Sequence, residues 1–253
     1  MTGDIFALVA AGGFLAAFVD SVVGGGGLVS VPVLLTAGLP PHLALGTNKL
    51  AGTMGSLTST LAFMRSGKVE MSVVKRLFPL TLIGSACGTL LLQAVPSAWL
   101  KPLVVVLLLA ITVYTLLKRS WGGEGVYRGS LTRRAGLLLA AAALLIGGYD
   151  GFFGPGTGSF LIFAFLMAGF DFVRAAGNAK VLNFGSNIAS LITFAGLGSI
   201  DWTIGLTMGV FMVAGSLAGS RLAIRQGAKY VRPLFIAVSS LLILKQIWDL
   251  ASR

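Results

Sequence analysis

The hydrophobic pattern of this chain consists of long apolar runs separated by short polar turns. Eight runs are long enough to cross a hydrocarbon core of about 30 Å as α-helix. They lie near residues 5–20, 42–64, 73–93, 98–117, 135–149, 175–195, 203–220 and 231–248. Two more runs, at 28–39 and 158–169, are too short for an ordinary span. A β-barrel would show short segments of alternating hydrophobicity instead of long apolar runs. The pattern therefore predicts an all-α polytopic membrane protein.

Composition agrees with this class. The 253 residues are 56% hydrophobic and 11% charged, with a mean hydropathy of +0.92, which is outside the range of a soluble domain. The formal net charge of +11 does not indicate a nucleic-acid partner, because the basic residues lie in short loops where anionic lipid headgroups are their natural contact. Asp4 stands where a signal peptide would be basic, so the first helix is expected to be retained.

The sequence repeats itself. At a shift of 131 residues, matching pairs run in order along the chain, and they include Gly38 with Gly169, Gly46 with Gly177, Lys49 with Lys180, Ser59 with Ser190 and Glu70 with Asp201. At a shift of 130, Asp20, Gly24 and Gly26 match Asp150, Gly154 and Gly156. We therefore predict two copies of one unit, residues 1–118 and 135–253, joined by a polar cytoplasmic linker at 119–134. Each unit holds one helix, one short segment and three further helices.

Loop charge predicts how these units are oriented. Arg65, Lys68, Lys75 and Arg76 follow the run at 42–64, so that loop is expected to be cytoplasmic. The equivalent second loop, around 196–202, has no Lys or Arg, and basic residues crowd the next loop instead. These are Arg221, Arg225, Lys229 and Arg232. The swap predicts inverted-topology repeats with both termini outside the membrane. Secondary transporters of this architecture bind their substrate near the midplane, between the repeats.

Two glycine-rich stretches, DSVVGGGGL at 20–28 and DGFFGPGTGS at 150–159, interrupt apolar helix. In hydrocarbon such a break survives only where protein or a water-filled cavity surrounds it. The N–H groups at the start of the following short helix then form an anion site. We expect both breaks to meet near the centre and to contribute Gly24, Gly25, Gly26, Gly27, Gly154, Gly156, Thr157 and Gly158 to substrate binding. Tight helix packing is the alternative, and it is favoured for the glycines of 84–88 and 215–219.

Four ionisable residues lie within apolar segments, where such residues indicate function. Lys49 and Lys180 are candidates for pairing with an anionic substrate. The neighbouring amide donors are Asn48, Asn178, Asn183 and Asn187. Two alternatives remain open for the lysines, which are snorkelling to an interface and structural bridges to Asp20 and Asp150. The aspartates either carry protons or cap the glycine turns.

Signals for catalysis are weak. The chain has no HExxH zinc motif and no GxxxxGK[ST] phosphate loop, and His42 and Cys87 are its only histidine and cysteine. We therefore expect no enzymatic activity, no cofactor and no metal site.

The two glycine-containing motifs carry a resemblance. Residues 20–56 and 149–187 resemble the paired motifs of the sulfite exporter TauE/SafE family, and the similarity extends over 5–250. Members often carry a Thr-Ser pair where this chain has Thr47, Asn48 and Lys49, and the chain looks most like the subgroup with an Asn-Lys pair in the first repeat. The resemblance implies an inner-membrane permease that exports sulfite or an organosulfonate such as sulfoacetate.

Together these observations predict a secondary transporter that exports a small anion by alternating access. Its partners would be that anion and the lipid bilayer, and a homo-oligomer is left open. The alternative is a channel-like pore in which the glycine loops form a carbonyl-lined filter for cations. A membrane scaffold without transport is a third hypothesis.

Overall fold

The chain is an all-helical bundle in the part that the structure describes. The structure is a computed structural model that describes residues 2–96, 98, 99, 103, 106, 107, 127 and 129–226. These residues contain no strand. The predicted helix at 231–248 lies outside the described residues, as do most of the run at 98–117 and of the linker. Tyr127 of the linker is described, and its N–H donates to Gly169 O at 2.8 Å.

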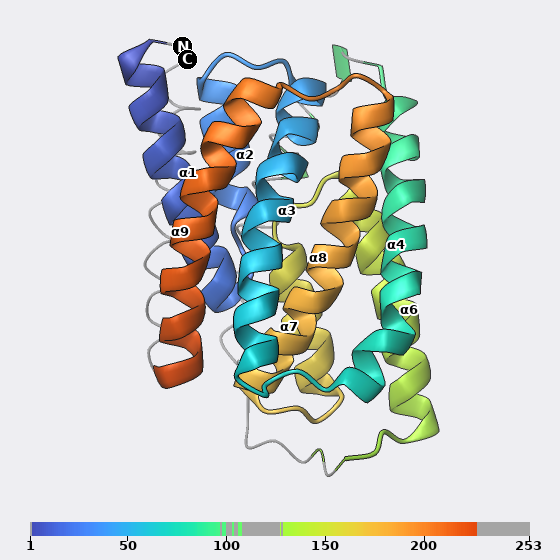
Figure 1. Ribbon diagram of the computed structural model, residues 1–253. Coiled ribbons are helices and arrows are strands. Elements are labelled where there is room, and N and C mark those ends of the chain that lie inside the picture. The colour runs from blue at the N-terminus through green and yellow to red at the C-terminus, as the bar shows by residue number, and fades with distance from the viewer. Residues whose placement is uncertain are drawn as a thin grey trace.

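Six long helices and two short ones make up most of the described chain, and they correspond to predicted apolar runs. The first half contains α1 (Gly3–Val23), α2 (Gly27–Thr36), α3 (Pro41–Arg65) and α4 (Met71–Gln93). The second half contains α6 (Arg133–Phe152), α7 (Thr157–Met167), α8 (Phe172–Gly196) and α9 (Trp202–Gln226). In Figure 1, α3 and α9 run from top to bottom, whereas α4, α6 and α8 run from bottom to top.

The distribution of apolar side chains is that of a membrane protein. Four helices, α1, α4, α6 and α9, are long and apolar enough to cross a membrane. Large apolar side chains such as Leu15, Ile83, Leu91, Leu145 and Ile192 are exposed on the outside of the bundle. The interior, in contrast, buries many Ser, Thr and Asn side chains and two lysines. An apolar exterior around a polar interior suits a lipid environment, so the chain is a multi-pass membrane protein.

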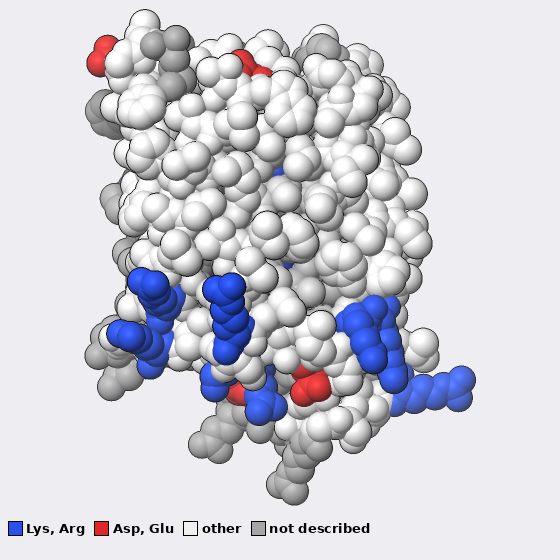
Figure 2. Space-filling model, viewed as in Figure 1, with Lys and Arg blue, Asp and Glu red and all other residues white. Residues whose placement is uncertain are grey.

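Lysine and arginine side chains gather at one end of the molecule, the lower end in Figure 2. At this end α3 and α9 finish with Arg65 and Arg225 in their last turns, and α6 begins with Arg133 and Arg134. We refer to it below as the basic end. Such a one-sided distribution of positive charge is the signal that orients membrane proteins.

Helices of the two halves are interleaved rather than separated into two bodies. α1 packs against α9, and α4 packs against α6. Glycines bring each pair into close contact: a Cβ atom added to Gly88 would lie 1.9 Å from Gly148 O, and one added to Gly215 would lie 2.1 Å from Phe14 O. The glycines of 84–88 and 215–219 therefore serve helix packing, the alternative that the sequence favoured for them.

This packing makes two neighbouring glycines respond oppositely to alanine. We expect Gly88→Ala to destabilise the fold by about 1–3 kcal/mol, because its Cβ atom would force α4 and α6 apart. A Cβ atom on Gly148 of the same interface would lie 3.5 Å from Gly84 O, an ordinary contact. Gly148→Ala is therefore expected to be neutral or stabilising by up to about 1 kcal/mol through helix propensity. Thermal unfolding in detergent measures both, and equal effects would contradict the prediction.

Candidate functional site

The two glycine breaks meet inside the bundle, as the sequence predicts. Gly24 follows the last residue of α1 with φ 81°, and the second break contains Gly154 at φ 99° and Gly156 at φ 88°, values that favour glycine. A Cβ atom on Gly24 would lie 2.2 Å from the carbonyl carbon of Gly158. The backbones of the two breaks are therefore in direct contact, which only residues without a side chain permit.

Hydrogen bonds join one break to the other. The N–H of Ser159 donates to Gly24 O at 2.9 Å, and its hydroxyl donates to Val23 O at 2.8 Å. Within the second break, the Tyr149 hydroxyl donates to Pro155 O at 2.5 Å. These bonds satisfy backbone groups that an unbroken helix would pair internally, which is the condition for a break at membrane depth.

Some N–H groups that the sequence assigned to an anion are used by the protein itself. Gly26 N–H donates to Asp20 Oδ1 at 3.3 Å, and Ser159 N–H makes the bond between the breaks. The N–H groups of Gly27 and Gly158, in the first turns of α2 and α7, have no recorded acceptor among the described residues. These two remain available for a ligand.

Each intramembrane lysine pairs with an aspartate of the other half. Lys49 Nζ lies 2.9 Å from Asp150 Oδ1, and Lys180 Nζ lies 2.6 Å from Asp20 Oδ2. The lysine side chains are 2% and 0% exposed, and those of Asp150 and Asp20 are 3% and 23% exposed. The sequence left open whether the lysines snorkel to an interface or form bridges to aspartate, and the structure shows the bridges. Each buried charge is thereby compensated.

The two aspartates differ in their second oxygen. Asp20 Oδ1 accepts from Gly26 N–H, so Asp20 also caps its glycine turn. Asp150 Oδ2 is buried and has no hydrogen-bond partner in the part of the chain that the structure describes. Capping thus applies to Asp20, and Asp150 keeps one carboxylate oxygen without a partner among the described residues.

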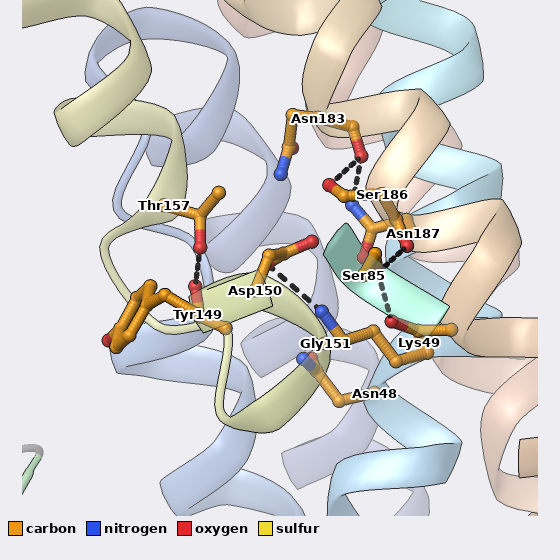
Figure 3. A network of polar contacts seen from close by, with 12 residues as sticks. Asn48, Lys49, Ser85, Tyr149, Asp150, Gly151, Thr157, Asn183, Ser186 and Asn187 are labelled. Carbon is orange, nitrogen blue, oxygen red and sulfur yellow. Dashed lines mark hydrogen bonds and ion pairs between the residues drawn. The ribbon is translucent and has the colours of Figure 1, made fainter. Parts of the chain in front are cut away.

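A cavity lies between the breaks and the middle of α3 and α8, with about 480 Å³ of empty space when the part open to solvent is included. Figure 3 shows Lys49 and Asp150 facing each other, with Asn48 beside the lysine and Asn183 and Asn187 on the neighbouring helix. The predicted site residues that line the cavity are Asp20, Gly24, Gly26, Gly27, Asn48, Lys49, Asp150, Gly154, Gly156, Thr157, Gly158, Asn183 and Asn187. Gly25, Asn178 and Lys180 do not line it.

Asn178 lies away from the cavity and supports a loop. Its Oδ1 accepts from Glu70 N–H, just before α4, at 2.7 Å. The N–H of Asp201, just before α9, donates in the same way to Thr47 Oγ1 at 2.9 Å. Thr47 and Asn178 are 131 residues apart, as are Glu70 and Asp201, so the two contacts are equivalent under the sequence repeat.

Sequence reasoning missed several residues of the cavity wall. On α3, Gly52 and Ser56 follow Lys49 at one face of the helix, with the spacing of Asn183 and Asn187 after Lys180. That spacing was a usable signal. Ser30 carried no such signal, and its hydroxyl donates to Asn48 Oδ1 at 2.6 Å. The other missed residues are Ala16, Ala17, Gly55, Met212 and Ser216.

The cavity wall consists mostly of hydrogen-bonding groups, and it contains the Lys49–Asp150 pair and the Asp20 carboxylate of the second pair. Among the described residues, no group of three or more His, Cys, Asp or Glu side chains is placed to hold a metal ion. Amide and hydroxyl groups, with a lysine whose charge is balanced by Asp150, suit a small polar solute that exchanges hydrogen bonds with the wall.

Comparison with known proteins decides the family. The model of the family described as "Sulfite exporter TauE/SafE" matches residues 9–246. The chain belongs to the TauE/SafE family. "Probable membrane transporter protein ORF9" of Sinorhizobium sp is 40% identical over 245 residues, which cover 96% of this chain and 92% of the relative. "Probable membrane transporter protein YfcA" of Escherichia coli K12 is 40% identical over 237 residues, which cover 93% and 87%.

A third TauE/SafE relative, "Probable membrane transporter protein" of Haemophilus influenzae, is 37% identical over 247 residues, which cover 97% of this chain and 96% of the relative. No solved structure gives a significant match. The comparisons confirm the family that the motifs at 20–56 and 149–187 indicate. This TauE/SafE protein is a membrane transporter, and both ion pairs lie within the matched residues.

Proposed function

We propose that this protein is a non-enzymatic secondary transporter that exports a small anion, such as sulfite or an organosulfonate, by alternating access between two inverted-topology repeats. The observation that carries the proposal is the pair of crossed Lys–Asp bridges, Lys49–Asp150 and Lys180–Asp20, beside a cavity at the two helix breaks. Charges placed at this depth belong to solute pathways by default. The family description supports sulfite as a first substrate to test.

Contacts between the halves support the inverted repeats. The crossed bridges obey the sequence repeat, as do the loop contacts of Asn178 and Thr47. A Cβ atom on Gly46 would meet Ser199 O, and one on its equivalent Gly177 would meet Lys68 O. The equivalent helices α3 and α8 run in opposite directions in Figure 1. A pseudo-twofold axis in the membrane plane relates repeats in this way.

The charge distribution supports the orientation that we propose. The basic end would face the cytoplasm of a bacterial-type cell, because positive loops remain on that side of the inner membrane. α1 begins at the opposite end of the bundle, which would place the N-terminus outside. The C-terminal residues lie outside the described part, and we propose that they end on the same outer side.

Neutral donors support an anion as the solute. The cavity wall contains the side-chain amides of Asn48, Asn183 and Asn187 and the N–H groups of Gly27 and Gly158. An oxyanion accepts hydrogen bonds from such groups and, at Lys49, competes with Asp150 for the ammonium. The inside-negative potential favours expulsion of an anion by about 2.3 kcal/mol per charge per 100 mV, so uniport would suffice.

The alternative of a carbonyl-lined cation pore receives less support. The carbonyl oxygens of Val23 and Gly24 accept hydrogen bonds from Ser159, and those of Gly26 and Gly154 accept from Ser30 and Thr157. A cation filter requires such oxygens to replace an ion's hydration shell. Here they are already used to hold the breaks together.

Flux in proteoliposomes tests the proposal. We expect saturable uptake of radiolabelled sulfite or sulfoacetate, counterflow with unlabelled solute, and weaker transport of sulfate and chloride. Current far above carrier rates without counterflow would instead identify a channel. Absence of flux for every anion, with the folded protein present in the vesicles, would contradict the proposal.

Asn48 offers a specific prediction within this assay. Replacing it by alanine removes an amide donor to the anion, worth about 1.5–3 kcal/mol for a hydrogen bond to a charged group. We expect the half-saturation concentration to rise about 10- to 100-fold. Thr58→Ala is the matched control on α3, because the Thr58 hydroxyl donates to Met54 O of its own helix. Equal half-saturation for both variants would remove Asn48 from the site.

Asp20 and Asp150 are further proposed as sites of proton coupling. Asp150 Oδ2 has no partner among the described residues, and Asp20 is 23% exposed. Protonation of either carboxyl would release its lysine toward the anion. Coupled transport is expected to acidify or alkalinise the vesicle lumen in proportion to anion flux, and flux without any pH change would favour uniport.

A further inference from the structure

A cluster of hydroxyl groups closes one side of the bundle between α4, α6 and α8. The Ser85 hydroxyl lies 2.6 Å from the Ser190 hydroxyl and 2.6 Å from Ser186 O. The Thr89 hydroxyl bridges to Ser190 Oγ at 3.0 Å and to Gly151 O at 3.1 Å. We call this the outer cluster, because α4 and α8 both run away from the basic end toward these residues.

The same sequence repeat defines an equivalent set near the basic end, which we call the inner cluster. The shift of 131 residues takes Ser85, Thr89, Ser186 and Ser190 to Ser216, Ser220, Gly55 and Ser59, and the upstream shift of 130 takes Gly151 to Ser21. The equivalent residues lie on α9, α3 and α1, near the ends at which α9 and α3 reach the basic end.

The inner cluster does not make the bonds of the outer cluster. The Ser59 hydroxyl donates to Gly55 O at 3.3 Å in its own helix, and the Ser220 hydroxyl donates to Leu217 O at 3.4 Å in its own helix. Ser21 Oγ is buried without a hydrogen-bond partner among the described residues. A buried hydroxyl without a partner is unfavourable, so Ser21 is unsatisfied. The bonds of Ser59 and Ser220 stay within single helices, whereas those of the outer cluster join different helices.

The cavity extends into the inner set. Gly55 and Ser216 line it together with Ala17 of α1, whereas the equivalent Ser186, Ser85 and Gly147 do not. The ion pairs show the same asymmetry, since Asp20 is 23% exposed and Asp150 only 3%. The hydroxyl bonding, the cavity lining and the exposure of Asp20 therefore all distinguish the side toward the basic end as the open one.

We infer that this structure is the state open toward the basic end, and that the outer and inner hydroxyl clusters are two gates that close in alternation. The inference deepens the proposed function and rests on it. In the opposite state, Ser216 of α9 would bond with Ser59 and Gly55 O of α3, and the bonds that Ser85 and Thr89 of α4 make to Ser186 and Ser190 of α8 would open.

The packing of the bundle supplies the moving parts. α1 and α9 are held together by Gly13, Gly215 and Gly219, whose added Cβ atoms would strike the partner backbone or side chain. α4 and α6 are held in the same way by Gly84, Gly88 and Gly151. Each pair contains one helix from each half, so movement of both pairs against α3 and α8 would exchange the two gates.

Cysteine cross-linking in the full-length protein tests the inference. In a Cys87→Ser background, the double variant Ser85→Cys/Ser190→Cys is expected to cross-link quickly under oxidant, because these hydroxyl oxygens lie 2.6 Å apart. The double variant Ser59→Cys/Ser216→Cys is expected to cross-link slowly, only when the inner gate closes. If this second variant is folded and never cross-links, the inference is wrong.

A second experiment weakens the outer gate and measures whether the inner gate closes more often. Adding Ser85→Ala to the Ser59→Cys/Ser216→Cys variant removes the hydroxyl at the centre of the outer cluster, which is expected to speed inner cross-linking about tenfold. Thr193→Ala is the matched control, because the Thr193 hydroxyl on α8 donates to Ala189 O of the same helix. Equal rates for both additions would overturn the inference.

The two proposals fail separately in this design. Cross-linking needs no substrate. If Ser85→Ala speeds inner cross-linking but no anion flux is found, the gates are supported and the proposed solute is refuted. If anion flux is normal but Ser85→Ala does not change the rate of inner cross-linking, the gates are refuted and the proposed transport function is not affected.

Discussion

Lys49→Ala is expected to destabilise the fold by about 3–5 kcal/mol, because it leaves the carboxylate of Asp150 buried without its cation. The Lys49 and Asp150 side chains are 2% and 3% exposed, so water does not replace the lost partner. Thermal unfolding in detergent is the measurement. Lys68→Ala, in the loop between α3 and α4, is the control and is expected to unfold like the parent protein.

A double variant separates stability from transport. Lys49→Met with Asp150→Leu replaces the bridge by apolar side chains of similar volume, and it is expected to recover most of the lost stability. It is also expected to lose anion flux, because no cation remains for the solute at that position. Full flux in this double variant would show that the bridge is only structural, and a Lys49→Ala variant as stable as the parent would contradict the burial argument itself.

Gly24→Ala has the second largest expected effect, a loss of more than about 3 kcal/mol. Its Cβ atom would lie 2.2 Å from the backbone of Gly158, so the two breaks could not remain in contact. Gly38→Ala is the control, since Gly38 has a similar φ of 95° and no atom within 4 Å of an added Cβ. Gly38→Ala is expected to cost only the left-handed conformation, about 1–2 kcal/mol.

The comparison of Gly24 with Gly38 isolates the contact from the backbone conformation. The yield of folded, detergent-extracted protein and its unfolding temperature are the readouts. If both variants lose the same stability, the meeting of the breaks contributes nothing beyond the φ angle.

Hydropathy was sufficient to place the helices that the structure describes, because the length of an apolar run and the thickness of a bilayer determine a span. It also placed α2 and α7 correctly as short helices. α3 and α8 fall short of the hydropathy of the other long helices, because their inward faces carry residues such as Asn48, Lys49, Lys180 and Asn183. A polar stripe on a buried helix is what the cavity requires.

The candidate site was only partly predictable. Repetition singled out Asp20, Asp150, Lys49 and Lys180, but no feature of the linear sequence states which lysine meets which aspartate. That pairing depends on how α1, α3, α6 and α8 pack, which is long-range information. Asn178 shares its helix and residue type with Asn183, yet it is turned toward Glu70, because five residues of helix rotate a side chain to a different face.

The interleaving of α1 with α9 and of α4 with α6 has a consequence for biogenesis. While a ribosome has delivered only residues 1–118 to the membrane, Asp20 has no Lys180 and the glycine face of α4 has no α6. The helices of the first half are therefore in the membrane before the Asp20 carboxylate has its lysine and before α6 packs against the glycines of α4. Co-expressed half-chains are therefore expected to be degraded singly and to accumulate together, which makes this transporter a case for studying how insertion machinery shelters incomplete helices.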